Sequence, residues 1–301
     1  MKQSVKLILL ALVLFCAYCA KAQDEEATDP GIDAESPANA NGTNQVETKR
    51  AGRLNGGVQS AIADYPYVVS VIVLDGAGYS NYLAGVIISD TQVLTAASGV
   101  VSYVNGIASI TIRAGSVYKD QGGFTFPVSK REPHPLYDDT TKENDVAVLT
   151  ITGSFSGNAN VAPITVATSD IPFSTANPAY CVVLGWGKDV SFNEITLLSR
   201  VVYKLAADAT CAAQFGGTMP ASQLCAESVA GYTCYSSIGF PLVCNNLLYG
   251  IYPNTDGCTP GIRKFIKAPA ASVQSFLAPY LPSATVTASQ PAPRKNYVSC
   301  P

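Results

Sequence analysis

The chain has 301 residues, a formal net charge of −3 and 48% hydrophobic residues. This length is enough for a large core, built as one domain or as two closely packed halves. The nearly balanced charge gives no reason to expect a nucleic acid or an anionic membrane as a partner. Many Gly, Pro, Val, Ile, Thr and Tyr residues favour strands and turns over helices. Neither a metal-ligand cluster nor a phosphate-binding glycine loop is visible, so we expect no metal and no cofactor.

Residues 1–22 predict a secretory signal peptide. Lys2 and Lys6 supply a basic start, residues 7–17 form an apolar run, and Ala22 ends a small-x-small cleavage site. A membrane anchor is the alternative, but the run is shorter than the about 20 apolar residues that span a bilayer. We therefore expect a secreted, extracellular protein whose cysteines pair in an oxidising compartment.

Residues 23–53 predict an exposed, disordered pro-segment. They contain almost no large apolar side chains, so burial cannot offset the entropy lost on ordering. The Asn-Gly-Thr sequon makes Asn41 a candidate glycosylation site. Arg53 ends a short basic stretch and is a candidate cleavage point. Residues 282–301 are expected to form a flexible C-terminal tail.

The first strand signals follow this segment. Residues 83–89 and 92–97 predict two strands around an Asp-Thr turn. The second strand leads into Ser98 and Gly99, within the sequence Thr-Ala-Ala-Ser-Gly.

A second informative stretch lies near the middle of the chain. Residues 144–149 read Asn-Asp-Val-Ala-Val-Leu and contain Asp145. His134, the only histidine of the chain, lies in the loop before them. We expect a structural or surface role for His134, because a general base has to reach its nucleophile.

Cysteines dominate the second half of the chain. Six lie between residues 181 and 258: Cys181, Cys211, Cys225, Cys234, Cys244 and Cys258. Six cysteines allow fifteen connectivities, so the sequence alone does not pair them. Cys300 is left over near the C-terminus, which predicts either a disulfide-linked dimer or a tail cysteine without a function.

Three further segments carry recognisable patterns. Residues 180–187 read Tyr-Cys-Val-Val-Leu-Gly-Trp-Gly, and residues 234–244 read Cys-Tyr-Ser-Ser-Ile-Gly-Phe-Pro-Leu-Val-Cys. Apolar residues at helical spacing between positions 270 and 280 predict a C-terminal helix.

These segments together resemble the trypsin/chymotrypsin-like serine proteases over residues 54–281. That family has a nucleophile segment Cys-x-Gly-Asp-Ser-Gly-Gly-Pro-Leu/Val-Val-Cys, a histidine after Thr/Ser-Ala-Ala, and an aspartate in Asn-Asp-Ile-Ala-Leu-Leu. The resemblance implies an all-β, chymotrypsin-like fold of two antiparallel six-stranded β-barrels with a C-terminal α-helix. It also implies the disulfides Cys181–Cys244, Cys211–Cys225 and Cys234–Cys258.

The resemblance implies degenerate catalytic positions. Ser98 stands for the histidine base and Ile238 for the nucleophilic serine, while Asp145 is retained. A serine hydroxyl is not basic near neutral pH, and an isoleucine has no lone pair, so we expect no catalytic residue. Asp145 is expected to hydrogen-bond Ser98 or to cap backbone N–H groups. Leu83 and Gly99 replace both cysteines of one family disulfide.

By the same alignment, the activation junction and the specificity pocket also differ from the family pattern. Leu-Asn-Gly-Gly after Arg53 aligns with the family's Ile-Val-Gly-Gly, but Ser237 replaces the aspartate that receives the freed ammonium group. The specificity-pocket positions hold Tyr232, Pro253, Asn254 and Thr255. We expect the Tyr232 ring to fill the pocket, through either drift after loss of catalysis or reshaping for another ligand.

We therefore expect a secreted, non-catalytic serine protease homologue that binds a secreted protein partner. The resemblance implies a partner that is a protease or another component of an extracellular proteolytic cascade, in immunity, clotting or reproductive fluid. One alternative is an active secreted serine endopeptidase with rearranged catalytic residues, using Ser236 or Ser237. Another is a structural or oligomerising secreted protein linked through Cys300.

Overall fold

A computed structural model describes residues 51–52, 54–101, 103–189, 191–234, 236–253 and 257–282. The predicted signal peptide, nearly all of the predicted pro-segment and the C-terminal tail from residue 283 lie outside these residues. So do several predicted site residues: Ala22, Asn41, Arg53, Asn254, Thr255 and Cys300. Within the described ranges, no helix is long and apolar enough to cross a membrane, and no group of His, Cys, Asp and Glu residues is arranged to hold a metal ion.

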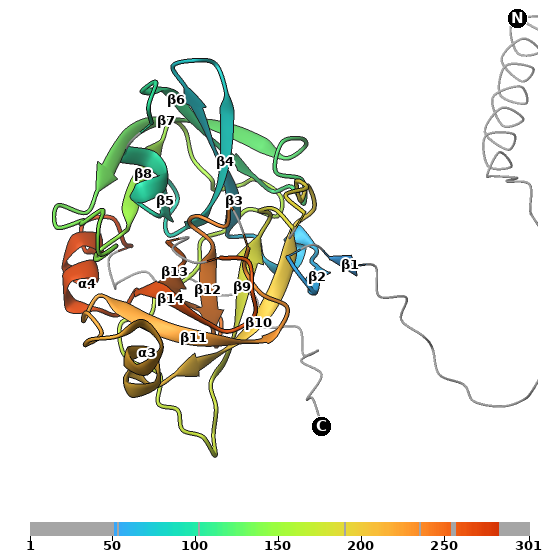
Figure 1. The fold of residues 1–301 in the computed structure, drawn as a ribbon. Coiled ribbons are helices and arrows are strands. Elements are labelled where there is room, and N and C mark those ends of the chain that lie inside the picture. The colour runs from blue at the N-terminus through green and yellow to red at the C-terminus, as the bar shows by residue number, and fades with distance from the viewer. Residues whose placement is uncertain are drawn as a thin grey trace, which may run out of the picture. The chain divides into compact units, whose positions relative to one another are not determined.

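The first half of the described chain forms a closed antiparallel barrel (Figure 1). Its strands are β3 (Val68–Asp75), β4 (Ser80–Ile87), β5 (Gln92–Thr95), β6 (Ile107–Ala114), β7 (Phe124–Pro133) and β8 (Ala147–Ile151). They pair in the order β3-β4-β5-β8-β7-β6, and β6 closes the barrel by pairing with β3. The short helix α2 (Ser98–Val101) follows β5 directly.

The second half forms another six-stranded barrel. Its strands are β9 (Tyr180–Gly185), β10 (Ser199–Ala206), β11 (Gln223–Ala230), β12 (Pro241–Cys244), β13 (Leu247–Ile251) and β14 (Ile262–Lys267). The sheet order β10-β11-β14-β13-β12-β9 is closed by pairing of β9 with β10. The remaining elements are β1 (Ala51–Gly52), β2 (Gly57–Gln59), the 3₁₀ turn η1 (Ile62–Asp64), α3 (Asp208–Phe215) and α4 (Ala271–Leu277).

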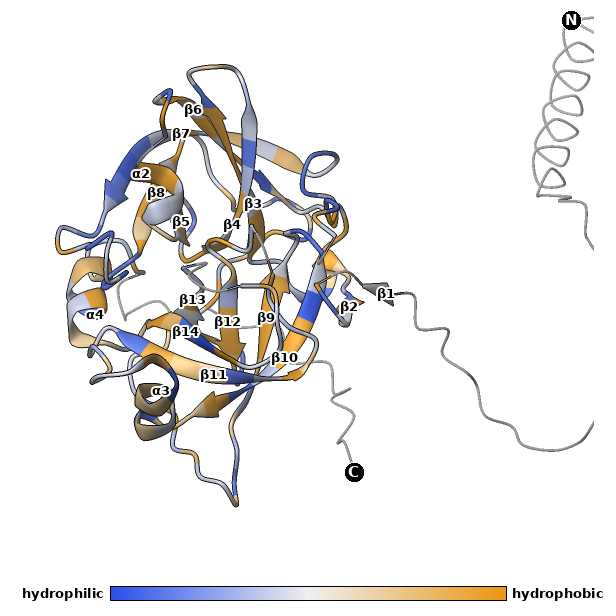
Figure 2. Cartoon of the chain, in the orientation of Figure 1, coloured by the Kyte–Doolittle hydropathy of each residue, from blue (hydrophilic) through white to orange (hydrophobic). Residues whose placement is uncertain are grey.

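Hydrophobic patterning explains why these segments form barrels. Every second residue of β10 is buried, as expected for a strand with one face toward a core. The buried apolar side chains form two clusters: one lies within the first barrel, and the other joins the second barrel to residues of β3, β4, β5 and β8. Figure 2 shows strongly hydrophobic strands in both halves. The predicted fold class, two antiparallel barrels with a C-terminal helix, is confirmed.

Three disulfides hold the second barrel: Cys181–Cys244, Cys211–Cys225 and Cys234–Cys258. These are the pairs that the resemblance implies. Cys181 on β9 and Cys244 on β12 face each other directly in the strand register, with their Cα atoms 4.3 Å apart. The sheet geometry therefore brings two cysteines 63 positions apart in sequence into bonding distance.

Candidate functional site

A cleft of about 420 Å³ lies between the two barrels. Residues 80–83 of β4 and the start of α2 line it on the side of the first barrel. Residues 186–188 and the turn at 236–240 line it on the side of the second barrel. A cleft between two barrels that is lined by both polar and apolar side chains is a common place for a binding site.

Ser98 and Asp145 form a closed hydrogen-bonded pair at this cleft. The backbone N–H of Ser98 donates to Oδ1 of Asp145 and its hydroxyl donates to Oδ2, both at 2.7 Å. The two roles considered for Asp145 from the sequence, bonding to the serine and capping a backbone N–H, therefore occur together. Asp145 is fully buried. Burial raises the pKa of its carboxyl group, and the hydrogen bonds from Ser98 offset only part of that rise.

Ile238 packs where the resemblance places a nucleophile. Its half-buried side chain packs against both clusters of buried apolar side chains. A Cβ atom added to Gly99 would lie 2.9 Å from Cγ2 of Ile238 and 2.7 Å from Cδ1 of Leu83. Leu83, Gly99 and Ile238 therefore fill one space by hydrocarbon contact, in the region where the family places a disulfide.

The turn from Ser236 to Phe240 keeps an unusual backbone. Ser236 has φ of 59°, a left-handed conformation that favours glycine and costs other residues about 1–2 kcal/mol. Gly239 has φ of 78°, and a Cβ there would lie 2.1 Å from the carbonyl oxygen of Ala84. Glycine is therefore required at position 239, whereas position 236 keeps a glycine-like backbone without the glycine.

Phe240 is accommodated by a glycine on another strand. The phenylalanine is 1% exposed, and a Cβ on Gly185 would lie 2.5 Å from its ring atoms. The ring thus occupies space above Gly185 at the end of β9. A bulky residue replaces the last glycine of the family's nucleophile segment without a steric clash, because Gly185 has no side chain and leaves room for the ring.

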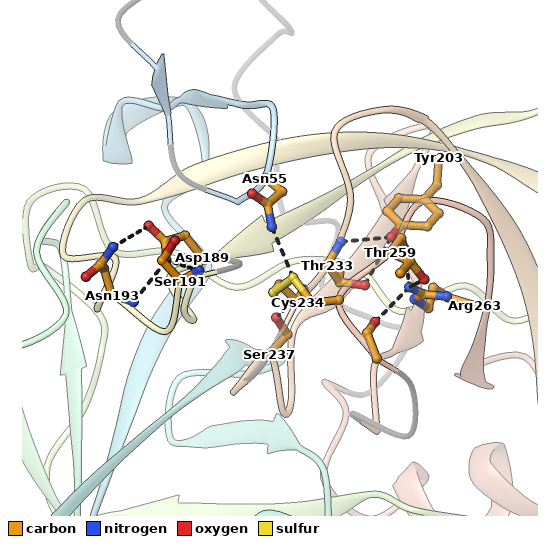
Figure 3. The surroundings of a disulfide bond; sticks show 12 residues. Asn55, Asp189, Ser191, Asn193, Tyr203, Thr233, Cys234, Ser237, Thr259 and Arg263 are labelled. Atoms are coloured by element: carbon orange, nitrogen blue, oxygen red, sulfur yellow. Dashed lines mark hydrogen bonds between the residues drawn. A yellow bond between two sulfur atoms is a disulfide. The ribbon is translucent and has the colours of Figure 1, made fainter.

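The segment that follows Arg53 is docked on the second barrel. Leu54 is fully buried in its core. The Asn55 side-chain amide donates to Sγ of Cys258 at 3.1 Å, and the Tyr232 N–H donates to the Asn55 carbonyl at 3.0 Å. Figure 3 shows Asn55 above the Cys234 disulfide, with Ser237 on its other side.

Ser237, the predicted replacement for the charge-receiving aspartate, is fully buried. Its hydroxyl accepts a hydrogen bond from the Cys234 N–H at 3.3 Å. It does not line the cleft, whereas Ser236 does. The two neighbouring hydroxyls therefore differ in access to a ligand.

The structure places the described specificity-pocket residues away from the cleft. Tyr232 is half-buried and lines a separate depression of about 340 Å³ with Asn55 and Gly56. Pro253 is buried. The neighbouring Tyr252 is fully buried, and it packs against Phe265 with ring centroids 5.4 Å apart.

His134 lies outside the cleft, as a structural contact between the first barrel and α4. It is 4% exposed, and its ring lies 4.9 Å from that of Phe276. The N–H of Leu136 donates to Nδ1 at 3.0 Å, so the proton is on Nε2, which donates to the Ser272 carbonyl at 3.2 Å. Both ring nitrogens are thereby engaged in holding the fold.

A charged cluster in the cleft was not foreseen from the sequence. Lys119, which follows the first-barrel strand β6, forms an ion pair with Glu194 of the second half. Lys188 bonds the other oxygen of the same carboxylate at 3.2 Å. Lys119 and Glu194 are 75 positions apart in sequence, so no local sequence pattern predicts their contact.

Comparison with known proteins agrees with this geometry. The family model named Trypsin matches residues 54–277. The chain belongs to the trypsin family.

Curated relatives lie at moderate identity. Hypodermin-A of Hypoderma lineatum is 33% identical over 205 residues, which cover 66% of this chain and 76% of that protein. Trypsin delta of Drosophila erecta and a trypsin of Sarcophaga bullata are each 31% identical, over 75% of this chain and 87% and 88% of the respective relatives.

Two solved structures share the fold, each at 21% identity and a TM-score of 0.63. One is described as HL collagenase and the other as the scabies mite inactivated protease paralogue S-D1. Each match covers 74% of this chain and 96% of the other chain.

Proposed function

We propose that this protein is a secreted, non-catalytic serine protease homologue that binds a secreted protein partner. One observation carries the proposal. The positions for a histidine base and a serine nucleophile hold Ser98, bonded to Asp145, and Ile238, packed on Gly99.

Acyl transfer by the family mechanism requires a nucleophile and a base that takes its proton. Ile238 offers only hydrocarbon. The single imidazole of the chain belongs to His134, whose two nitrogens bond to Leu136 and Ser272. Ser98 holds its hydroxyl proton toward a carboxylate, a much weaker base than an imidazole. Loss of triad members costs several powers of ten in rate, so we propose that catalysis is absent.

A binding role is supported by what remains of the molecule. Both barrels, three disulfides and an inter-barrel cleft are intact although the catalytic positions are replaced. The substitutions are also well packed, because Leu83 and Ile238 fill the space beside Gly99. The proposed partner is a protease or another component of an extracellular cascade, since the relatives named above include trypsins.

Partner capture tests the binding role. The secreted wild-type protein and an Ile238→Glu variant would be immobilised and exposed to the source fluid, with Val229→Glu as a control at an exposed site outside the cleft. We expect a partner that the wild type and the control retain and the cleft variant loses. The purified partner must then bind the purified wild type with the same ranking. Absence of any specific partner, with all three proteins folded, would contradict the proposed function.

A disulfide-linked assembly through Cys300 remains a separate proposal. Non-reducing electrophoresis of the wild type beside Cys300→Ser tests it directly. A dimer band that the variant lacks would support it, and a monomer in both would contradict it.

A further inference from the structure

Two lysines from opposite sides of the cleft meet at one carboxylate. Lys119 follows β6, and its backbone N–H donates to the Thr196 carbonyl at 3.3 Å. Lys188 belongs to the hairpin that returns to Glu194, with which it also forms a backbone bridge. The carboxylate of Glu194 therefore lies between two ammonium groups, one from each half of the molecule.

Exposure differs sharply among these three side chains. The Lys119 side chain is only 6% exposed, and its ammonium group lies 4.4 Å from the centre of the Tyr82 ring. A lysine buried to this extent needs a carboxylate partner, because burying an unpaired charge has a large free-energy cost. The Glu194 side chain is 50% exposed and the Lys188 side chain 33%. The acid thus sits at the rim, where water can solvate it if it leaves the lysines.

The cleft has a positive surplus. Of the described residues that line it, Lys119 and Lys188 are basic and Glu194 is the only acid. The Asp145 carboxyl group, which accepts from the Ser98 hydroxyl, is buried and does not line the cleft. An anionic group entering the cleft would therefore meet one uncompensated positive charge.

Apolar side chains lie beside this charge. Leu83, Ile238, Phe240 and Trp186 line the same cleft. The Trp186 indole N–H is already bonded to the Val117 carbonyl at 2.9 Å, so its ring serves as an apolar wall. A volume of about 420 Å³ falls within the range of small-ligand sites.

We propose that the cleft binds an acidic peptide segment of the partner protein, with a carboxylate held by Lys119 and Lys188 and a neighbouring apolar side chain on Leu83 and Ile238. In the peptide-bound state the Glu194 carboxylate leaves the two lysines and turns to solvent. Glu194 thus acts as an internal competitor of the partner's acid. This inference rests on the proposed binding function and specifies the chemistry of the bound segment.

Paired peptides test the proposal on the full-length secreted protein. The probes are a fluorescein-labelled Gly-Leu-Glu-Leu-Gly amide and its twin with Gln in place of Glu, and binding is read by fluorescence polarisation. We expect the wild type to prefer the Glu peptide by roughly tenfold. Lys188→Gln should remove the preference, and Glu194→Gln should strengthen binding of the Glu peptide. Lys204→Gln is the matched control, because Lys204 pairs with Glu227 at 3.0 Å outside the cleft.

The outcomes separate the two proposals. Equal binding of both peptides, or no binding up to about 1 mM, would overturn the inference. So would a preference that survives Lys188→Gln. Mass spectrometry of the same samples reports cleavage: intact peptides leave the non-catalytic function standing, whereas cleavage by the wild type would contradict that function instead. Circular dichroism of each variant verifies that it is folded.

Discussion

Ser98 gives both of its donors to Asp145, one to each carboxylate oxygen and each at 2.7 Å. The carboxylate is therefore satisfied by a residue that cannot act as a base, and it has become a structural cap at the start of α2. Because Asp145 is fully buried, we expect its hydrogen bonds with Ser98 to contribute measurably to the free energy of unfolding.

The first prediction concerns substitution of Asp145. Asp145→Ala should lower the free energy of unfolding by about 1–3 kcal/mol, because both donors of Ser98 lose their acceptor. Asp145→Asn should cost less, since the Ser98 hydroxyl can turn and accept from the new amide. Urea unfolding at neutral pH measures both variants. Equal losses for Ala and Asn would contradict the hydrogen-bonding account.

The pH dependence of the same pair has a definite sign. Burial raises the pKa of Asp145 in the folded state above the about 3.9 of an unfolded chain. Folding therefore favours the protonated acid, and the stability it contributes is present below the unfolded pKa and is lost as pH rises through the folded pKa. The wild type should thus lose stability relative to Asp145→Asn over that interval. A difference that stays constant or grows with pH would contradict the raised pKa.

The packing at Gly99 predicts a coupled pair of substitutions. Gly99→Ala should destabilise the protein by about 1–3 kcal/mol, because the new Cβ meets Leu83 and Ile238 at less than contact distance. In Leu83→Ala, which removes the closest of these atoms, the same Gly99→Ala change should cost less. Gly257→Ala is the control, since a Cβ there meets nothing within 4 Å. Simple additivity of the two changes in thermal unfolding would argue against the contact.

Docking of the segment after Arg53 predicts the effect of truncating Leu54. Leu54→Ala should cost about 2–5 kcal/mol, because the side chain is fully buried in the core of the second barrel. Val58→Ala, four residues later and 55% exposed, should change stability little. Denaturant unfolding compares the two. If both variants matched the wild type, the docked position of Leu54 would be wrong.

The barrels were predictable because their signals are local or lie in short motifs. The Thr-Ala-Ala-Ser-Gly stretch contains the end of β5 and the start of α2, and α4 coincides with the apolar residues at helical spacing. The paired loss of two cysteines at Leu83 and Gly99 was visible in sequence. The contact of Ile238 with the same space beside Gly99 could not be predicted from the sequence, because it depends on how the two barrels pack together.

The remaining site features depend on contacts that are remote in sequence. Lys119 and Glu194 meet only because the segments that carry them adjoin in the fold, and charges in loops follow no periodic pattern. Tyr232 was expected to fill a pocket, but its backbone bonds to Asn55 and its side chain lines another depression. Such placements are set by tertiary packing, which overrides local preference.

The central claim is that this member of the trypsin family carries out no acyl transfer. The most direct measurement is labelling of the full secreted chain by a fluorophosphonate probe, next to an active trypsin. We predict a labelled trypsin and an unlabelled chain. A labelled chain whose signal disappears in Ser98→Ala, Ser236→Ala or Ser237→Ala would contradict the claim and identify the serine responsible.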